Sequence, residues 1–110
     1  MYLPKTDIYN SLKKLNYYVS QIQPPVFNDL PAIIFRIDNN NVNIDLNNEI
    51  TSQNIDIIID IWFMDSVTGS KVLNEIENLM RNNLYRMTFS ADVPNVDSLQ
   101  HINCRFSKLI

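Results

Sequence analysis

The chain has 110 residues, of which 45% are hydrophobic and 19% charged, and its net charge at pH 7 is −3. This length predicts a single domain, residues 1–110, with a sizeable core. The acidic balance argues against a module that holds nucleic acid through its phosphates. One cysteine excludes an internal disulfide and, with one histidine, a Cys/His zinc site. No stretch is long and apolar enough for a membrane span, and no apolar leader is visible. We therefore expect a soluble protein of a reducing compartment.

Asparagine is abundant in this chain and glycine almost absent. With Gly69 as the one glycine, a glycine-rich phosphate loop cannot form, and no cofactor is expected. Asparagine tolerates left-handed backbone conformations. The clusters Asn39–Asn41 and Asn47–Asn48 therefore predict hairpin turns.

The N-terminal part predicts a short helix and a strand. Thr6 has the character of a capping residue, and Ile8, Leu12 and Leu15 follow with helical spacing up to a stop at Asn16. Residues 17–22 favour an extended strand. Beyond them, Pro24, Pro25 and Pro31 predict an irregular segment around Phe27, because proline lacks the N–H that a central strand must donate.

The middle of the chain predicts β structure. Residues 33–37 and 42–46 both alternate between apolar and polar side chains, and the asparagines between them predict a hairpin. The clearest strand is 55–64, whose odd positions form an unbroken apolar face that must be core. Its even face mixes acids with large apolar groups: Asp56, Ile58, Asp60, Trp62 and Met64.

The last part predicts a helix followed by two strands. Residues 65–69 read as a break, 70–83 as an amphipathic helix, and 84–89 and 101–109 as closing strands. The expected order is α-β-β-β-β-α-β-β. This order is typical of an α+β fold, an antiparallel or mixed sheet with two helices packed on one face.

No combination of residues predicts catalysis. His101 and Cys104 are three positions apart on an expected strand, so their side chains point to opposite faces. Asp56 and Asp60 share a face but lie roughly 13 Å apart, too far for a paired-carboxylate site. We therefore assign no catalytic, cofactor or metal residue and expect a protein that is not an enzyme.

The mixed face of strand 55–64 leaves several interpretations open. Its acids could pair with Arg36 or Arg105 on neighbouring strands, the face could contact another subunit or line a channel, or it could hold a metal. A local loop could cover Trp62, or Trp62 could anchor a subunit contact. The candidate interface or lumen residues are Asp56, Ile58, Asp60, Trp62, Met64, Pro24, Pro25 and Phe27.

The order of segments resembles a known family. A short helix leads to "DLPAIIFRI", a polar hairpin and the strand "IDIIIDIWFMD". The helix "GSKVLNEIENLMRN" and the closing piece "DVPNVDSLQHINCRFSKLI" follow. This pattern is similar to the small tail-terminator or tail-completion proteins, also called head–tail joining or neck proteins, of long-tailed bacteriophages and prophages. The Asn-rich, Gly-poor composition departs from many members of that family.

The resemblance implies a structural role in the virion. Such proteins form a ring, usually of six copies, at the end of the tail tube, where they end polymerisation and meet the head connector. The implied partners are further copies of the chain, the tail tube protein and the connector proteins. DNA passes without specific binding, and no membrane is involved. The implied location is the tail end or neck, and the host cytoplasm during assembly. An acidic lumen would repel DNA phosphates, and Asp56 and Asp60 are candidates for it.

Two alternatives accompany this interpretation. The chain could be a head-side neck adaptor of the same ring type, which the sequence does not separate from a tail terminator. It could instead be a monomeric or dimeric α+β module that binds another protein. Oligomeric state distinguishes the ring from the module, because a ring needs two different complementary patches on each subunit.

Overall fold

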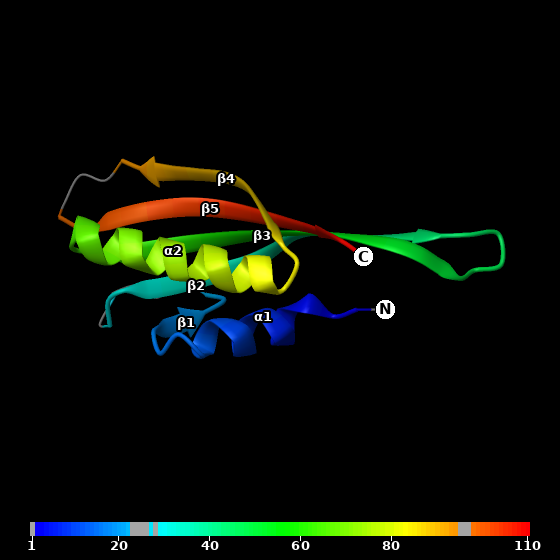
Figure 1. Ribbon diagram of the computed structural model, residues 1–110, viewed down its shortest axis with the longest axis horizontal. Coiled ribbons are helices and arrows are strands. Elements are labelled where there is room, and N and C mark those ends of the chain that lie inside the picture. Colours follow the sequence, from blue (N-terminus) through cyan, green and yellow to red (C-terminus); the bar gives the residue numbers. More distant parts are fainter. Residues whose placement is uncertain (1, 23–26, 28, 95–97) are drawn as a thin grey trace.

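The computed structural model describes residues 2–22, 27, 29–94 and 98–110. Two helices lie in front of a twisted sheet, and the chain termini are close together near its middle (Figure 1). The elements in chain order are α1 (Pro4–Lys13), β1 (Tyr18–Ser20), β2 (Ala32–Ile44), β3 (Ile50–Phe63), α2 (Ser66–Asn82), β4 (Arg86–Val93) and β5 (Gln100–Leu109).

The five strands form one mixed sheet in the order β1-β2-β3-β5-β4. β1 runs parallel to β2, and the other neighbours are antiparallel. Both helices pack on the same face (Figure 1), so the predicted α+β class and its one-sided helical layer are confirmed. One strand fewer precedes α2 than expected, because the two strands predicted at 33–37 and 42–46 are one.

The first asparagine cluster is part of a strand, and its predicted hairpin turn is wrong. Asn39, Asn40 and Asn41 pair with β3 directly after a bulge that follows Ile37. The turn lies at the second cluster, between Asp45 and Glu49. There the Asp45 carboxylate accepts hydrogen bonds from the backbone N–H groups of residues 47 and 49, at 2.8 and 2.9 Å, and Asn48 has a φ of 62°. Hydrogen bonds from an aspartate carboxylate to its own loop stabilise a turn, so the turn forms at Asp45 rather than at the first asparagine cluster.

The core lies between the helices and the inner face of the sheet. The predicted inner face of β3 is confirmed, because its five alternate residues are at most 3% exposed: Ile55, Ile57, Ile59, Ile61 and Phe63. From α1, Ile8 and Leu12 close one side of this layer. The helix begins at Pro4 with Thr6 inside it, because proline suits the first helical turn, and Asn16 follows its end with a φ of 64°.

The predicted break at 65–69 is the first turn of α2. The Asp65 carboxylate accepts the Thr68 backbone N–H at 3.2 Å and so caps the helix at Ser66. Gly69 lies within this turn for a packing reason. A Cβ there would stand 2.3 Å from Phe63 Cε2, so the phenylalanine ring occupies the space that any larger residue needs.

The hairpin of β2 and β3 projects beyond the rest of the sheet. It makes the molecule elongated, 54 × 26 × 23 Å, and extends away from both helices (Figure 1). β5 accompanies β3 only as far as Asn54, and the backbone of Ile110 pairs with Gln53. We call residues 42–52 the arm. At its base the buried Gln53 amide bonds the Tyr2 backbone and the Asn40 side chain.

Candidate functional site

The candidate site is the sheet face opposite the helices, which we call the open face. Strand register sets its rows. Arg36, Ile58 and Arg105 lie side by side on β2, β3 and β5. The next row is Ile34, Asp60 and Asn103, and the following row is Ala32, Trp62 and His101.

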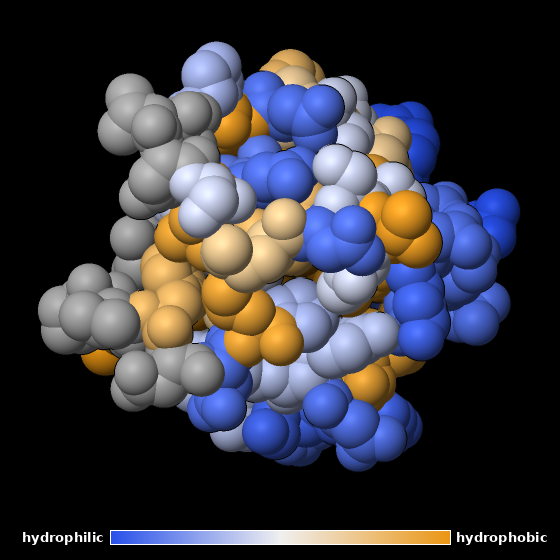
Figure 2. Space-filling model, turned by 90° about the vertical axis from the view of Figure 1, so that its left-hand side faces the viewer, coloured by the Kyte–Doolittle hydropathy of each residue, from blue (hydrophilic) through white to orange (hydrophobic). Residues whose placement is uncertain are grey.

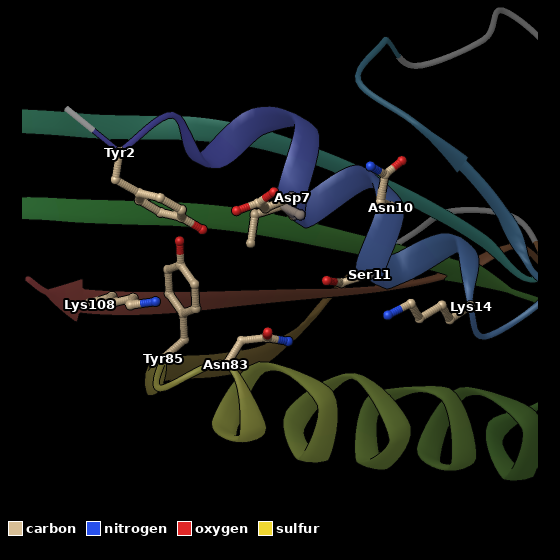
Figure 3. Close-up of a pocket in the computed structure, with 9 residues that line it drawn as sticks. Tyr2, Asp7, Asn10, Ser11, Lys14, Asn83, Tyr85 and Lys108 are labelled. Carbon is tan, nitrogen blue, oxygen red and sulfur yellow. The ribbon is translucent and has the colours of Figure 1, made fainter.

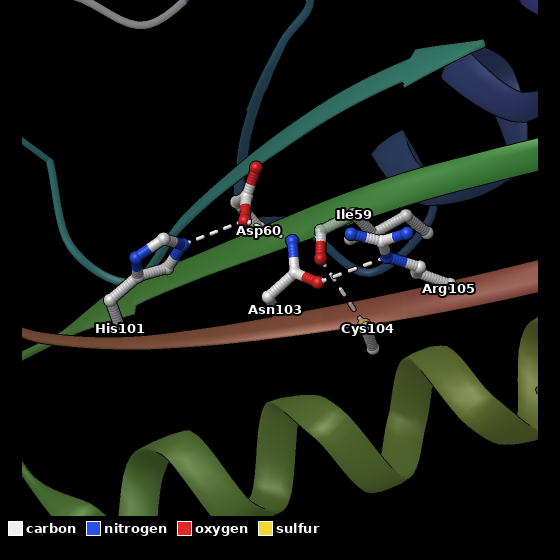
Figure 4. Close-up of polar contacts among 6 residues, drawn as sticks. All are labelled: Ile59, Asp60, His101, Asn103, Cys104 and Arg105. Atoms are coloured by element: carbon white, nitrogen blue, oxygen red, sulfur yellow. Dashed lines mark hydrogen bonds and ion pairs between the residues drawn. The ribbon is translucent and has the colours of Figure 1, made fainter. Parts of the chain in front are cut away.

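Asp60 is the centre of a polar cluster on this face (Figure 4). Its Oδ1 lies 2.7 Å from His101 Nε2 and accepts a hydrogen bond from the Asn103 amide at 2.8 Å. An ionised carboxylate only accepts, so the imidazole N–H donates. The His101 and Asp60 side chains are 13% and 24% exposed, so the pair is held in partly dry surroundings. Hydrogen bonds to a charged group in such a place are stronger than neutral ones.

Trp62 completes this cluster. Its ring stacks on the His101 imidazole, with centroids 3.8 Å apart and planes 11° apart. From the segment before β2, the Phe27 ring approaches it at 5.0 Å. Phe27 therefore covers part of Trp62, as the local-loop interpretation predicts. The Trp62 Nε1 is buried without a hydrogen-bond partner among the described residues.

Ion pairs between the sheet acids and Arg36 or Arg105 are absent among the described residues. Register places both arginines beside Ile58, between the two acids, so they miss the carboxylates. Arg36 meets Asp38 at 3.6 Å, and the Arg105 guanidinium lies 5.5 Å from the centre of the Phe89 ring. Asp56 instead accepts a hydrogen bond of 3.3 Å from the Asn39 amide.

The other candidate interface residues are scattered. Ile58 is 3% exposed and offers little surface for contact. Met64 follows the end of β3 and is 52% exposed. It shares that end of the molecule with Val67 and Val93, and Figure 2 shows apolar side chains among polar ones on this end. Pro24 and Pro25 lie outside the described residues.

Cys104 and His101 point to opposite faces of β5, as their spacing predicts. Cys104 is fully buried under the helices, and its thiol donates to the Ile59 carbonyl at 3.3 Å. Burial, and secondarily the Asp60 charge, raises the pKa of this thiol to about 12. The sulfur is therefore protonated at neutral pH and makes no contact with the imidazole side of the sheet.

The described part of the chain contains no group of three or more His, Cys, Asp or Glu side chains placed to hold a metal ion. Its two helices are also too short or too polar to cross a bilayer. No family model and no curated protein significantly matches the chain. The open face must therefore be interpreted from its own chemistry.

Sequence reasoning missed the cluster that organises the open face. It placed Asp60 and Trp62 on one face but treated His101 as an ordinary strand residue. The signal that could have found it is the outward position of His101 on its own strand. Pairing it with Trp62 requires the register between two strands that are 37 residues apart in the chain, and periodicity alone carries no register.

Proposed function

We propose that this protein is a structural subunit of a long phage or prophage tail. In this proposal it forms a ring of copies at the end of the tail tube, stops tube polymerisation and joins the tail to the head. It acts in the virion at the tail end or neck, after assembly in the host cytoplasm. The order of helices and strands behind the family resemblance supports this function.

The observation that carries the proposal is the one-sided layering of the sheet. α1 and α2 cover one face, whereas the open face presents aromatic, polar and charged side chains, and no helix of the described residues covers it. Arg36 and Phe89 remain well exposed there. Arginine and large aromatic residues are enriched where proteins contact one another.

The two edges of the sheet also favour assembly. Among the described residues, β4 pairs only with β5, and β2 beyond Ile34 pairs only with β3. Each edge therefore has backbone groups available for another strand. The edges belong to different strands, so a contact between them is heterologous and repeats into a ring when the rotation closes.

Tube capture tests this function. Purified protein is mixed with uncapped tail tubes of a phage whose genome carries the sequence, and the tubes are sedimented and imaged. We expect the protein to sediment with the tubes, to form a ring at one end and to stop elongation. Arg36→Glu should weaken capture, and Lys71→Glu on the helical face, with the same charge change, should not.

Three other outcomes would contradict the tail-terminator role. A ring that binds the head connector and ignores the tube would point to the head-side adaptor. A monomer or dimer that binds neither would point to the protein-binding module. Continued tube growth in the presence of bound protein would show that binding does not end polymerisation.

A substitution of Asp56 tests whether this residue lines an acidic lumen of the ring. Asp60 is bonded to both His101 and Asn103, whereas Asp56 has one hydrogen bond, of 3.3 Å, among the described residues, so we expect its substitution to disturb the sheet less. We expect Asp56→Lys particles to assemble but to eject DNA more slowly, because lysine attracts phosphates. The slowing should fade in high salt. Normal ejection at low salt would remove Asp56 from the lumen.

A further inference from the structure

The arm exposes apolar and acidic side chains of the kind that contact another protein surface. It contains two acids, Asp45 and Glu49, and no lysine or arginine. Three of its apolar side chains, Ile44, Leu46 and Ile50, are 60%, 102% and 48% exposed. A two-stranded hairpin without a third strand or a helix over it is marginally stable in water. The arm would therefore gain order from a surface that covers it.

A polar groove between α1 and the end of α2 offers such a surface. It encloses about 350 Å³. Figure 3 shows Lys108 at one end, beside the Tyr2 and Tyr85 rings, and Lys14 at the other end. Its lining residues are Tyr2, Asp7, Ile8, Asn10, Ser11, Lys14, Asn83, Tyr85 and Lys108.

The groove has more donors than its own acceptors use. Neither Lys14 nor Lys108 forms an ion pair with a described residue; Lys108 Nζ instead lies 5.1 Å from the centres of the Tyr2 and Tyr85 rings. Tyr85 is 3% exposed, and its buried hydroxyl faces that of Tyr2 in Figure 3. Burial raises the pKa of Tyr85, so its hydroxyl keeps its proton.

We propose that the arm of one copy docks in this groove of the next copy, with the Glu49 carboxylate placed at Lys14. Leu46 would lie against the half-buried Tyr2 ring. This inference rests on the proposed function, since it adds a second contact between neighbours of the ring to the one at the sheet edges. Asp45 stays occupied with its own turn, which keeps the arm tip in shape.

The arrangement of the molecule makes this contact intermolecular. The arm extends away from both helices along the long axis, so it leads away from its own groove (Figure 1). Arm and groove are different surfaces, so the contact is heterologous and each copy can give one arm and receive another. This satisfies the two-patch requirement of a ring.

Charge favours the groove over the apolar end of the molecule as the site for the arm. The end that carries Met64, Val67 and Val93 is also exposed, but the exposed acids Asp65 and Asp92 border it. An acidic arm would be repelled there, whereas the groove holds two lysines against one aspartate. The observations therefore favour a second copy of this chain as the occupant of the groove.

A charge exchange tests the contact. Self-association of the full chain is measured by sedimentation velocity over a concentration series. We expect Glu49→Lys and Lys14→Glu each to raise the apparent dissociation constant about tenfold, and the double variant to recover to within about threefold of the original chain. Glu77→Lys and Lys71→Glu make the same charge changes away from arm and groove, and should leave the constant nearly unchanged.

Three outcomes would contradict the docking. The chain could stay monomeric at every concentration, or the single variants could self-associate as well as their controls. The double variant could also self-associate as poorly as the two single changes combined predict. Circular dichroism confirms that each variant folds. These measurements use the protein alone. A chain that assembles through arm and groove but fails to cap tubes would contradict the proposed function and leave the docking intact.

Cross-linking gives a second, geometric readout. Glu49→Cys protein is mixed with Lys14→Cys protein under mild oxidation, with the buried native Cys104 present in both. We expect a disulfide-linked pair that contains one of each variant. Replacing Glu49→Cys by Glu77→Cys should abolish it. Equal cross-linking by both would show that the arm does not reach the groove.

Discussion

Substituting alanine for Gly69 is expected to lower the free energy of unfolding by about 1–3 kcal/mol, although alanine is the better helix former by about 1 kcal/mol. The added methyl would stand 2.3 to 2.6 Å from three atoms of the Phe63 ring. Phe63 is 3% exposed and ends the most buried strand, so its ring has little room to move. Urea unfolding followed by circular dichroism measures the loss.

A double-mutant cycle with Phe63 tests the cause. Phe63→Leu shortens the side chain and opens the space that the methyl needs. In that background Gly69→Ala should cost far less than in the original chain, and the coupling between the two sites should exceed about 0.5 kcal/mol. A stabilising effect of Gly69→Ala alone would show that the close approach to Phe63 is not real.

The core could be predicted because it depends on periodicity. Alternation over 55–63 fixes which side of β3 is buried whatever the neighbouring strands do, and the stripe of Ile8 and Leu12 faces it for the same reason. The class of fold follows, since two amphipathic helices with runs of strands have few ways to cover one another. Local pattern was sufficient for both.

The hairpin and the start of α2 could not be predicted, because each depends on a competition between distant groups. Asparagines 39–41 are good turn residues, yet pairing with β3 carries them into the strand, and Asp45 supplies a better turn. Gly69 by itself indicates a break in the helix, whereas in the structure it lies in α2 because the Phe63 ring leaves no room for a side chain. The type of a residue limits the backbone conformations that it can adopt, and the tertiary contacts of the fold decide which of these conformations it takes.

The candidate site was predictable in part. Asp56, Asp60 and Trp62 were placed on the correct face, but their partners were not, since the expected arginines lie one row away and His101 takes their place. The groove between the helices was not predicted at all. It joins Tyr2 and Lys108 from opposite ends of the chain, and no local pattern connects them.

Asp60→Ala is expected to lower the free energy of unfolding by about 1–3 kcal/mol, because it removes the acceptor of two charge-assisted hydrogen bonds and leaves two half-buried donors unpaired. The His101 imidazole would lose the contact that fixes its ring beside Trp62. Because Trp62 is the one tryptophan of the chain, its fluorescence reports the stack directly. We expect a changed Trp62 emission in the folded variant together with the lower urea midpoint.

Asp56→Ala is the matched control, since both acids lie on the same face of β3 and only Asp60 has two short hydrogen bonds. Asp56 has a single bond of 3.3 Å to Asn39, so its loss should cost less than about 1 kcal/mol and leave the Trp62 emission unchanged. Equal costs for both variants would mean that the cluster adds nothing beyond an ordinary exposed contact. A larger cost at Asp60 would show that its hydrogen bonds to His101 and Asn103 stabilise the open face.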